Sequence, residues 1–379
     1  MPAAAASSAT RYATASPKAP SDVSMNRNTE LSNRWWSVCN PVAGAEVSTP
    51  RKRPGLNDAL GGHRWLERVE ASSRVGVAVI FPGQGSQGAG MGIPWRDHPA
   101  WSVVTRAEDA LGEPLAPLLL VESADELTRT RDTQLAVLLA SLIAWEAVRD
   151  TLPAPLAFAG HSLGQVTALI AAGTLSLEDG VRLAAHRAEL TQAAADRHGG
   201  RMVALMGADG EQVAEACSAA PGECWLANDN APGQIVIAGT ASGVERAAKV
   251  ATEAGVRRVI PLSVGGAFHT PLMQDAADGL ADFLAGVDFA APSVPVVSNT
   301  DAVPYTDGDG WRTRLVEHLI SPVRWRPSMT TVVSELSAST LVEVGYGSTL
   351  SGLAKRCVPG TPVLTVGSPA DVPPPPEVN

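Results

Sequence analysis

Apolar residues along the chain come in short runs that are separated by longer helical stretches. The segment 75–87 opens with an apolar run that stops at a Pro-Gly pair, which predicts a buried strand ending in a turn. The runs at 294–299 and 339–345 predict further strands. The stretch 132–150 is apolar nearly all round and predicts a central helix with Asp132 as its N-cap. Strands that alternate with helices indicate an α/β protein.

The pattern changes between residues 201 and 264. Four strand-like runs and two helical stretches follow one another there in the order β-α-β-β-α-β, which predicts a small ferredoxin-like subdomain within 201–264. This subdomain interrupts a larger α/β body formed by residues 74–200 and 265–368. Residues 1–73 are rich in Ala, Ser, Pro and Arg and predict a disordered leader, and residues 369–379 form a Pro-rich tail.

Composition and charge narrow the class of protein. The 379 residues are 45% apolar and carry a formal charge of −10, which argues against non-specific binding of nucleic acid. The chain has no apolar run of ~18 residues and its start lacks the apolar core of a secretory signal, so we expect neither a membrane span nor export. The four scattered cysteines fit no zinc spacing, and we expect reduced thiols, no bound metal and a cytoplasmic location.

The candidate nucleophile is Ser162, in the motif GHSLG at 160–164. Gly-x-Ser-x-Gly between a predicted strand and a predicted helix is the pattern of a nucleophile elbow, although an ordinary turn with these residues is the alternative. The elbow places the serine at a helix N-terminus, where free amides favour negative charge. The Leu163 amide is therefore a candidate donor of an oxyanion hole.

A serine hydroxyl needs a base, and His269 is the best placed of the seven histidines. It follows a predicted strand and two glycines, so it lies on a loop at the strand's end, where a histidine without a role would look the same. Arg187 lies on the helix after the elbow, at a spacing that returns it to the level of Ser162. Its guanidinium there would hold the carboxylate of an acyl group, unless it faces solvent.

Together these residues resemble the malonyl-CoA:acyl carrier protein transacylases and the acyltransferase units of polyketide synthases. The similarity runs from about Val75 to Gly367, and its sequence blocks occur in the order typical of the family. The blocks are FPGQGSQ at 81–87, GHSLG at 160–164, HRAELTQ at 186–192, NDNAPGQIVIAG at 228–239, AFHTPLM at 267–273, SPVRW at 321–325 and EVGYGSTLSGL at 343–353.

The resemblance implies an α/β-hydrolase-like body with the ferredoxin-like subdomain inserted into it. Within this body Ser162 and His269 would form a catalytic dyad. Gln84 and the Leu163 amide would form the oxyanion hole, and Arg187 would bind the malonyl carboxylate. In the family, a backbone carbonyl from the segment before SPVRW orients the histidine.

The chain departs from the family pattern at two positions near this site. It has His318 where the family usually has Gln, in the segment that orients the dyad histidine, and Gln165 where many relatives have Glu. His318 and His161 are therefore further candidate substrate-binding residues.

Phe268, directly before the dyad histidine, matches the family form that is associated with malonyl units. A ring there narrows the pocket beside the acyl α-carbon, where one methyl group is worth ~1–3 kcal/mol. Gly266 and Ala267 replace a bulkier pair and would give room back. Malonyl is the expected unit, with methylmalonyl or ethylmalonyl as the alternative.

The function implied is that of a ping-pong [acyl-carrier-protein] S-malonyltransferase. Ser162 would take malonyl from malonyl-CoA and pass it to the phosphopantetheine thiol of an acyl carrier protein, with no metal or redox cofactor. The carrier would belong to fatty-acid or polyketide synthesis, and the sequence leaves that choice open.

Two alternatives remain from the residues themselves. An acyl-thioester hydrolase uses the same elbow; Arg187 and the lack of an obvious third-member acid favour transfer, but Asp301 could be such an acid. A docking module tethered by residues 1–74 is the other alternative, and the intact Ser, His and Arg set argues against it.

Overall fold

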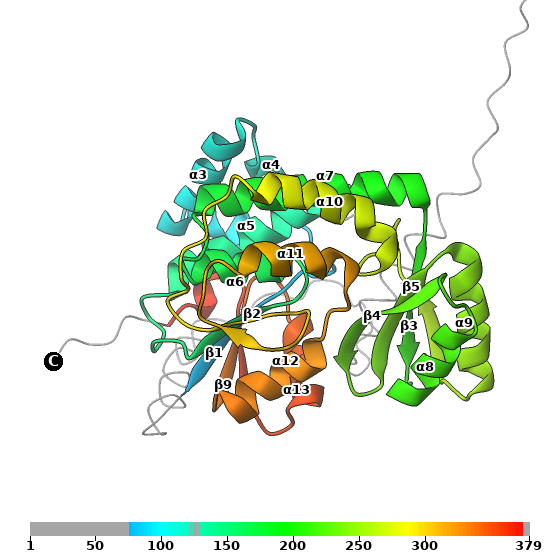
Figure 1. Ribbon diagram of the computed structural model, residues 1–379. Coiled ribbons are helices and arrows are strands. Elements are labelled where there is room, and N and C mark those ends of the chain that lie inside the picture. Colours follow the sequence, from blue (N-terminus) through cyan, green and yellow to red (C-terminus); the bar gives the residue numbers. More distant parts are fainter. Residues whose placement is uncertain (1–75, 122, 124–126, 128, 374–379) are drawn as a thin grey trace, which may run out of the picture.

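The computed structural model describes residues 76–121, 123, 127 and 129–373 (Figure 1). The predicted leader at 1–73 and the last residues of the predicted tail lie outside this part of the chain. The described residues form two subdomains side by side, each built around its own sheet (Figure 1). None of the described helices is both long and apolar enough to cross a membrane.

The larger subdomain is built on a six-stranded sheet in the order β10-β9-β1-β2-β7-β8. Its strands pair in parallel except β8, which is antiparallel to β7. Parallel strands are buried on both faces, which explains why the segment 75–87 opens with a continuous apolar run. The strands are β1 (Val77–Phe81), β2 (Ala157–Gly160), β7 (Val296–Val297), β8 (Pro304–Tyr305), β9 (Thr340–Val344) and β10 (Val363–Val366).

Helices cover both faces of this sheet. Successive side chains of a strand point to opposite faces, so Val79 and Phe81 pack into the main core with α5, whereas Ala78 and Ile80 pack with α12 and α13. The helices are α3 (Ser102–Leu111), α4 (Ala116–Leu120), α5 (Thr130–Val148), α6 (Gly164–Ala171), α7 (Leu177–His198), α10 (Gln274–Leu284), α11 (Trp311–Ile320), α12 (Trp325–Thr330) and α13 (Thr349–Cys357).

The helix α5 is the predicted central helix, and most of its residues are buried. It begins at Thr130, and its N-cap residue, Arg129, makes no side-chain capping bond. The expected N-cap at Asp132 is therefore wrong. Asp132 lies in the first turn instead, where a carboxylate is favoured by the helix dipole.

The smaller subdomain has the predicted order of strands and helices. Its antiparallel sheet runs β4-β5-β3-β6, with α8 and α9 packed against it, which is the ferredoxin-like arrangement (Figure 1). The elements are β3 (Arg201–Met206), α8 (Gly210–Ser218), β4 (Cys224–Ala231), β5 (Gln234–Gly239), α9 (Ala241–Glu253) and β6 (Arg258–Pro261).

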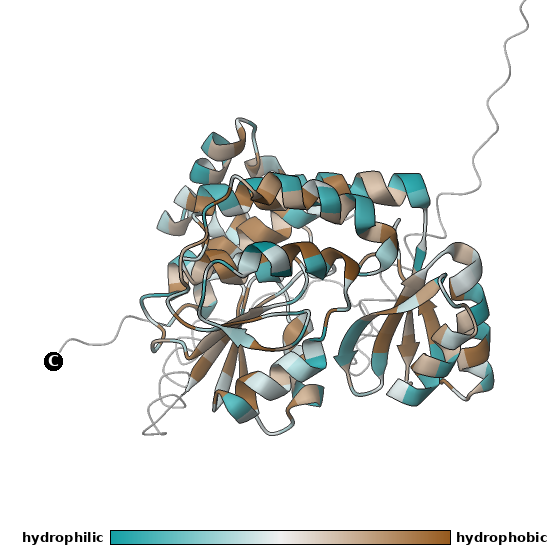
Figure 2. Ribbon diagram, viewed as in Figure 1, coloured by the Kyte–Doolittle hydropathy of each residue, from teal (hydrophilic) through white to brown (hydrophobic). Residues whose placement is uncertain are grey.

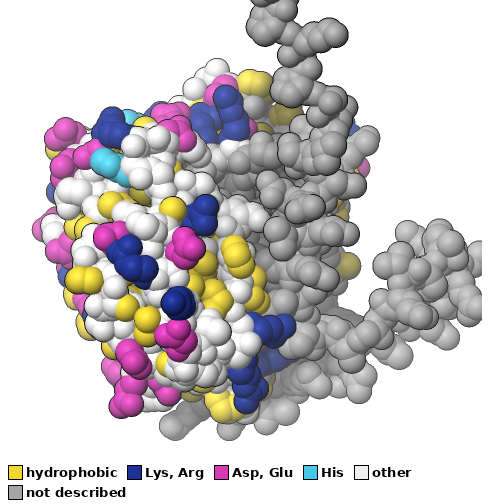
Figure 3. All heavy atoms as spheres, turned by 90° about the vertical axis from the view of Figure 1, so that its right-hand side faces the viewer, with side chains coloured by type: hydrophobic (Ala, Val, Ile, Leu, Met, Phe, Trp, Pro, Cys, Tyr) yellow, Lys and Arg dark blue, Asp and Glu magenta, His cyan; other side chains and the backbone are white. Residues whose placement is uncertain are grey.

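The outer surface of this subdomain is polar. Hydrophobic residues concentrate in the strands and on the inner faces of the helices (Figure 2). Acidic and basic side chains are interspersed on the face that includes α8 and α9, where Arg246 pairs with Glu223 and Lys249 with Glu253 (Figure 3).

The two subdomains are joined along the edge strand β4. The Asp229 amide donates to the Val323 carbonyl oxygen, and the Val323 amide donates to the Ala227 carbonyl oxygen, each over 2.9 Å. The side chain of Arg326 also pairs with the Asp229 carboxylate at 2.8 Å. The segment SPVRW therefore holds the small sheet against the larger subdomain.

The first residues of the predicted tail have a defined structure. Pro369–Asp371 forms a 3-10 turn, and a capping box between Ser368 and Asp371 closes it. The Pro-rich stretch thus begins after this turn rather than at 369.

Candidate active site

The motif GHSLG forms a sharp turn between β2 and α6. Ser162 has a positive φ of 51°, which is unfavourable for a residue with a side chain. A Cβ at Gly160 would lie 1.8 Å from the Gly164 carbonyl oxygen, and a Cβ at Gly164 would lie 2.1 Å from the Phe81 carbonyl oxygen. Gly160 is therefore required for the turn to close onto the start of α6, and Gly164 for it to close against β1.

The loop after β1 lies directly on this turn. A Cβ at Gly83 would lie 2.3 Å from the His161 carbonyl oxygen and 3.5 Å from the Leu163 nitrogen. The next residue, Gln84, lines the same cavity as Ser162. The two residues expected to form an oxyanion hole, Gln84 and Leu163, thus lie on adjacent turns beside the serine.

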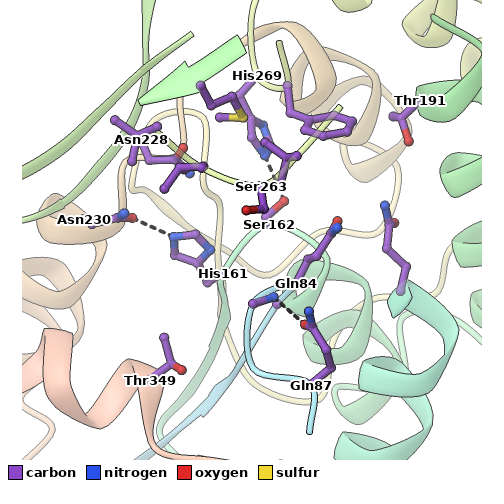
Figure 4. Close-up of a pocket in the computed structure, with 18 of the residues that line it drawn as sticks. Gln84, Gln87, His161, Ser162, Thr191, Asn228, Asn230, Ser263, His269 and Thr349 are labelled. Atoms are coloured by element: carbon purple, nitrogen blue, oxygen red, sulfur yellow. Dashed lines mark hydrogen bonds between the residues drawn. The ribbon is translucent and has the colours of Figure 1, made fainter. Parts of the chain in front are cut away.

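His269 lies against the serine. Its Nε2 is 2.8 Å from the Ser162 hydroxyl (Figure 4). Its Nδ1 is 2.9 Å from the His318 carbonyl oxygen. Because a carbonyl oxygen only accepts, Nδ1 carries the proton and Nε2 presents its lone pair to the hydroxyl. The geometry is that of a nucleophile and its base.

The histidine has no carboxylate partner among the described residues. Asp301, the candidate third-member acid, accepts from the Tyr305 hydroxyl at 2.6 Å and from the Val303 amide at 3.1 Å. Asp301 is therefore engaged in its own loop, and the carbonyl of His318 takes the position that an acid holds in a triad.

Arg187 reaches the serine from α7. Its Nη2 is 3.2 Å from the Ser162 hydroxyl, and its Nη1 donates to the Gln134 side-chain oxygen over 2.6 Å. The side chain is 6% exposed, and no described carboxylate pairs with it. The alternative of a solvent-facing arginine is therefore wrong, and a buried guanidinium without a counter-ion suits an anionic ligand.

Burial changes the protonation of both groups. It lowers the pKa of Arg187 to about 10, which leaves the guanidinium charged at neutral pH. Burial first, and the charge of Arg187 second, lower the pKa of His269 to about 3. His269 is thus neutral at physiological pH and able to accept a proton.

These groups face a cavity of about 300 Å³ between the subdomains (Figure 4). The polar residues that line it include Ser162, Arg187, His269 and Gln84. The apolar residues that line it include Met202, Val236, Leu262 and Val264 of the small subdomain and Met273, Leu319, Leu350 and Leu353 of the larger one. The small subdomain thus supplies much of the apolar surface that an acyl chain or its thioester arm would meet.

Phe268 also lines the cavity. A Cβ at Gly266 would lie 2.7 Å from the Ala195 Cβ and 3.3 Å from the Phe268 ring. The space left by the missing side chain is thus filled by α7 and by the ring. The expectation that Gly266 gives room back to the acyl group is therefore wrong, and Ala267 is buried and does not line the cavity.

The other two candidate histidines differ in position. His161 lines the cavity, and its Nε2 lies 2.8 Å from the Asn230 side-chain oxygen (Figure 4). The ring of His318 is buried 5.0 Å from that of His269 and forms no part of the cavity wall. Its expected role as a side chain that binds substrate is therefore not supported, because the ring packs against His269 without facing the cavity.

Two buried amides of the site were missed at the sequence level. Gln134 holds Arg187, and its only signal was a polar residue at the edge of the long apolar run of its helix. Asn299 accepts from the Ser162 amide at 2.8 Å and is the last residue of the strand predicted at 294–299. A polar residue at the carboxyl end of a parallel strand was the signal that could have identified it.

Comparisons with known proteins place this geometry in context. A family model described as "Acyl transferase domain" matches residues 78–363. The malonyl CoA-acyl carrier protein transacylase of Bacillus subtilis (strain 168) is 38% identical over 301 residues, which are 78% of this chain and 95% of that protein. The transacylase of the same name from Escherichia coli (strain K12) is 41% identical over 288 residues, 74% of this chain and 92% of that protein.

A solved structure is similar as well. It is a type II PKS acyl carrier protein in complex with its malonyl-transacylase, and it matches with a TM-score of 0.74 and 37% identity. The match covers 78% of this chain and 97% of that chain.

The close approach at the elbow predicts a selective effect of Gly164→Ala. The added Cβ would meet backbone atoms of β1, which cannot move aside, so we expect the free energy of unfolding to fall by about 3 kcal/mol. Gly210→Ala is the matched control, since its Cβ meets nothing within 4 Å; a change below about 1 kcal/mol is expected there. Urea unfolding measures both, and equal effects would contradict this account of the elbow.

Proposed function

The chain belongs to the acyl transferase domain family, and from that premise we propose that it transfers a malonyl group from CoA to the phosphopantetheine thiol of an acyl carrier protein. One observation carries the proposal: the buried Arg187 cation lies 3.2 Å from the hydroxyl of Ser162, with no described carboxylate beside it. An acyl group that ends in a carboxylate supplies the missing anion. The names of the relatives point to the same acyl group.

The first half-reaction acylates the serine. His269 takes the hydroxyl proton on Nε2 as the oxygen of Ser162 attacks the thioester carbonyl of malonyl-CoA. The amides of Leu163 and Gln84 stabilise the oxyanion. The C–S bond then breaks, and His269 returns the proton to the departing CoA thiolate.

The malonyl carboxylate also strengthens the base. In the free enzyme, the charge of Arg187 is the second cause of the low pKa of His269. A carboxylate paired with Arg187 offsets that charge, so the pKa of His269 rises when substrate is bound. The base becomes stronger at the step in which it must accept a proton.

The second half-reaction reverses the first. The carrier's thiol attacks the malonyl ester, His269 takes the thiol proton, and the proton returns to the oxygen of Ser162 as the malonyl thioester leaves. Hydrolysis by the same serine is the alternative. The carbonyl of His318 at Nδ1, in place of a triad acid, supports transfer over hydrolysis.

The proposal needs no metal or redox cofactor, because Ser162, His269 and two backbone amides supply the nucleophile, the base and the oxyanion donors. We place the reaction in the cytoplasm, where CoA thioesters are made. The acceptor proposed is a carrier protein of polyketide or fatty-acid synthesis, since one similar structure contains a type II PKS carrier. The Phe268 ring, held between Gly266 and the cavity, supports malonyl over methylmalonyl and ethylmalonyl.

Intact-mass spectrometry tests this function. After brief exposure to malonyl-CoA, we expect a malonyl adduct that is absent in Ser162→Ala and that discharges onto a holo-carrier protein. Arg187→Met removes the cation and should lower the rate of malonyl transfer by ~10²-fold or more, but spare acetyl-CoA. An adduct that discharges only to water would indicate a hydrolase, and equal losses for malonyl and acetyl would contradict the role of Arg187.

The pH dependence follows from the charges of the site. A base with a pKa of about 3 loses its function only as the pH falls through that value, so kcat/KM should show no acid limb near 6.5, the ordinary pKa of a histidine. Because bound malonyl raises the pKa of His269, the acid limb of kcat should lie at higher pH than that of kcat/KM. Steady-state rates across the pH range check this, and an acid limb of kcat/KM near 6.5 would contradict it.

The backbone role of His318 predicts that its side chain is replaceable. His318→Gln keeps the carbonyl that accepts from His269, so the rate of acylation should stay within about 3-fold. His269→Gln, which removes the base, should lower the same rate by ~10³-fold. Single-turnover assays compare the two, and losses of similar size would assign a direct role to the His318 ring.

A further inference from the structure

Asn299 bridges two backbone groups of the elbow, those of Ser162 and Gly160, and does not line the cavity that the reacting groups face. It lies just after β7 and is 1% exposed. Its Oδ1 accepts from the Ser162 amide at 2.8 Å, and its Nδ2 donates to the Gly160 carbonyl oxygen at 2.8 Å. Both partners are backbone groups, so the orientation of the amide is fixed: the donor at Ser162 requires an oxygen, and the acceptor at Gly160 requires an N–H.

Gln165 holds Asn299 in the same way. It lies in the first turn of α6 and is 2% exposed. Its Oε1 accepts from the backbone N–H of Asn299 at 3.0 Å, and its Nε2 donates to the Val297 carbonyl oxygen at 3.3 Å. We call these four hydrogen bonds the amide clamp. In the clamp, the side-chain amide of Asn299 binds the backbone of Ser162 and Gly160, and the side-chain amide of Gln165 binds the backbone of Asn299 and Val297.

The clamp acts on the strained residue of the site. Ser162 keeps a φ of 51° while its hydroxyl stays 2.8 Å from His269 and 3.2 Å from Arg187. Asn299 bonds to the residue itself and to the backbone two residues before it, so it bridges the turn in which that strain resides. Asn299 also occupies the backbone N–H of Ser162 with a hydrogen bond. The oxyanion is therefore left to a different N–H, the backbone N–H of Leu163 proposed above.

We propose that Asn299 is a positioning residue for the acylation of Ser162, and that Gln165 keeps it in place. The inference rests on the proposed function, because it concerns the rate at which the same serine is acylated. Asn299 does not line the cavity and touches no substrate; it acts through the backbone of residues 160–162.

The side chain at position 299 must both accept a hydrogen bond from the Ser162 amide and donate one to the Gly160 carbonyl. Asn299→Asp keeps an oxygen for the Ser162 amide, but an ionised carboxylate has no proton for the Gly160 carbonyl. A protonated carboxyl restores that donor. Burial raises the pKa of the carboxyl introduced, so the protonated form prevails at low pH and is lost as the pH rises.

Single-turnover acylation by malonyl-CoA tests the proposal on the full chain. Asn299→Ala should lower the acylation rate constant by ~10²-fold and leave the KM for malonyl-CoA within about 3-fold, since misplacing the nucleophile affects chemistry more than binding. For Asn299→Asp, the rate relative to the unmodified protein should fall at least ~10-fold between about pH 5.5 and pH 8.

Three variants serve as controls. Ser298→Ala removes a neighbouring buried hydroxyl that bonds only to Thr300, and its rate should stay within about 2-fold. Gln165→Glu keeps the oxygen that accepts from the Asn299 backbone N–H, but only its protonated form can donate to the Val297 carbonyl, so it should retain most of the rate only at low pH. Gln165→Leu should lose ~10-fold or more at every pH. Circular dichroism at each pH restricts the comparison to folded protein.

The outcomes separate this inference from the proposed function. If the unmodified protein forms no malonyl adduct, the proposed function fails. If it does, and Asn299→Ala acylates at the same rate or the relative rate of Asn299→Asp is constant with pH, the positioning role is overturned. Should Asn299→Ala not fold, the pH series of Asn299→Asp decides.

Discussion

The site depends on one electrostatic constraint: two positive charges cannot be held together in the same desolvated space. Arg187 is buried beside Ser162 and keeps its charge, and burial together with this neighbouring charge keeps His269 neutral. An unpaired buried ion costs several kcal/mol, which an anionic substrate recovers when it binds. The same cation thus favours a carboxylated acyl group and keeps the base in the form that can accept a proton. A backbone carbonyl at Nδ1 suffices to orient such a histidine, because no counter-ion is needed for a neutral ring.

The rest of the fold holds Arg187 and His269 against Ser162, whose backbone is strained by its positive φ. A positive φ at a residue with a side chain costs on the order of 1–3 kcal/mol, and a buried hydrogen bond returns about 1 kcal/mol. The two bonds from Asn299 therefore match the strain at Ser162 in size. Gly160 and Gly164 remove the side chains that would keep β1 and α6 apart. The small subdomain closes the cavity, and its attachment at Val323 lies in the segment that follows His318.

Much of the arrangement could be predicted from the sequence, because it is encoded locally. Spacing predicted the elbow, its glycines and the return of Arg187 along α7, although it left an ordinary turn and a solvent-facing arginine as alternatives. The order of elements in 201–264 follows from periodicity. Gln134 and Asn299 could not be predicted in this way, since their partners lie 53 and 137 residues away. The same limit explains the error at Gly266, where the missing volume is filled by Ala195 of another element. At Asp132 the residue type was right for a cap, but the helix begins at Thr130, which bonds to Gln192, and Arg131 pairs with Glu113 and Glu189.

The central claim is that the buried Arg187 cation selects a carboxylated acyl group and helps to keep His269 neutral. The most direct measurement is a crystal structure of the malonyl-enzyme, formed by the unmodified protein with malonyl-CoA in the absence of a carrier thiol. The account predicts the malonyl ester on Ser162, its carboxylate on the two Nη atoms of Arg187, and its carbonyl oxygen at the amides of Leu163 and Gln84. A malonyl carboxylate directed away from Arg187, into solvent or towards the small subdomain, would contradict it.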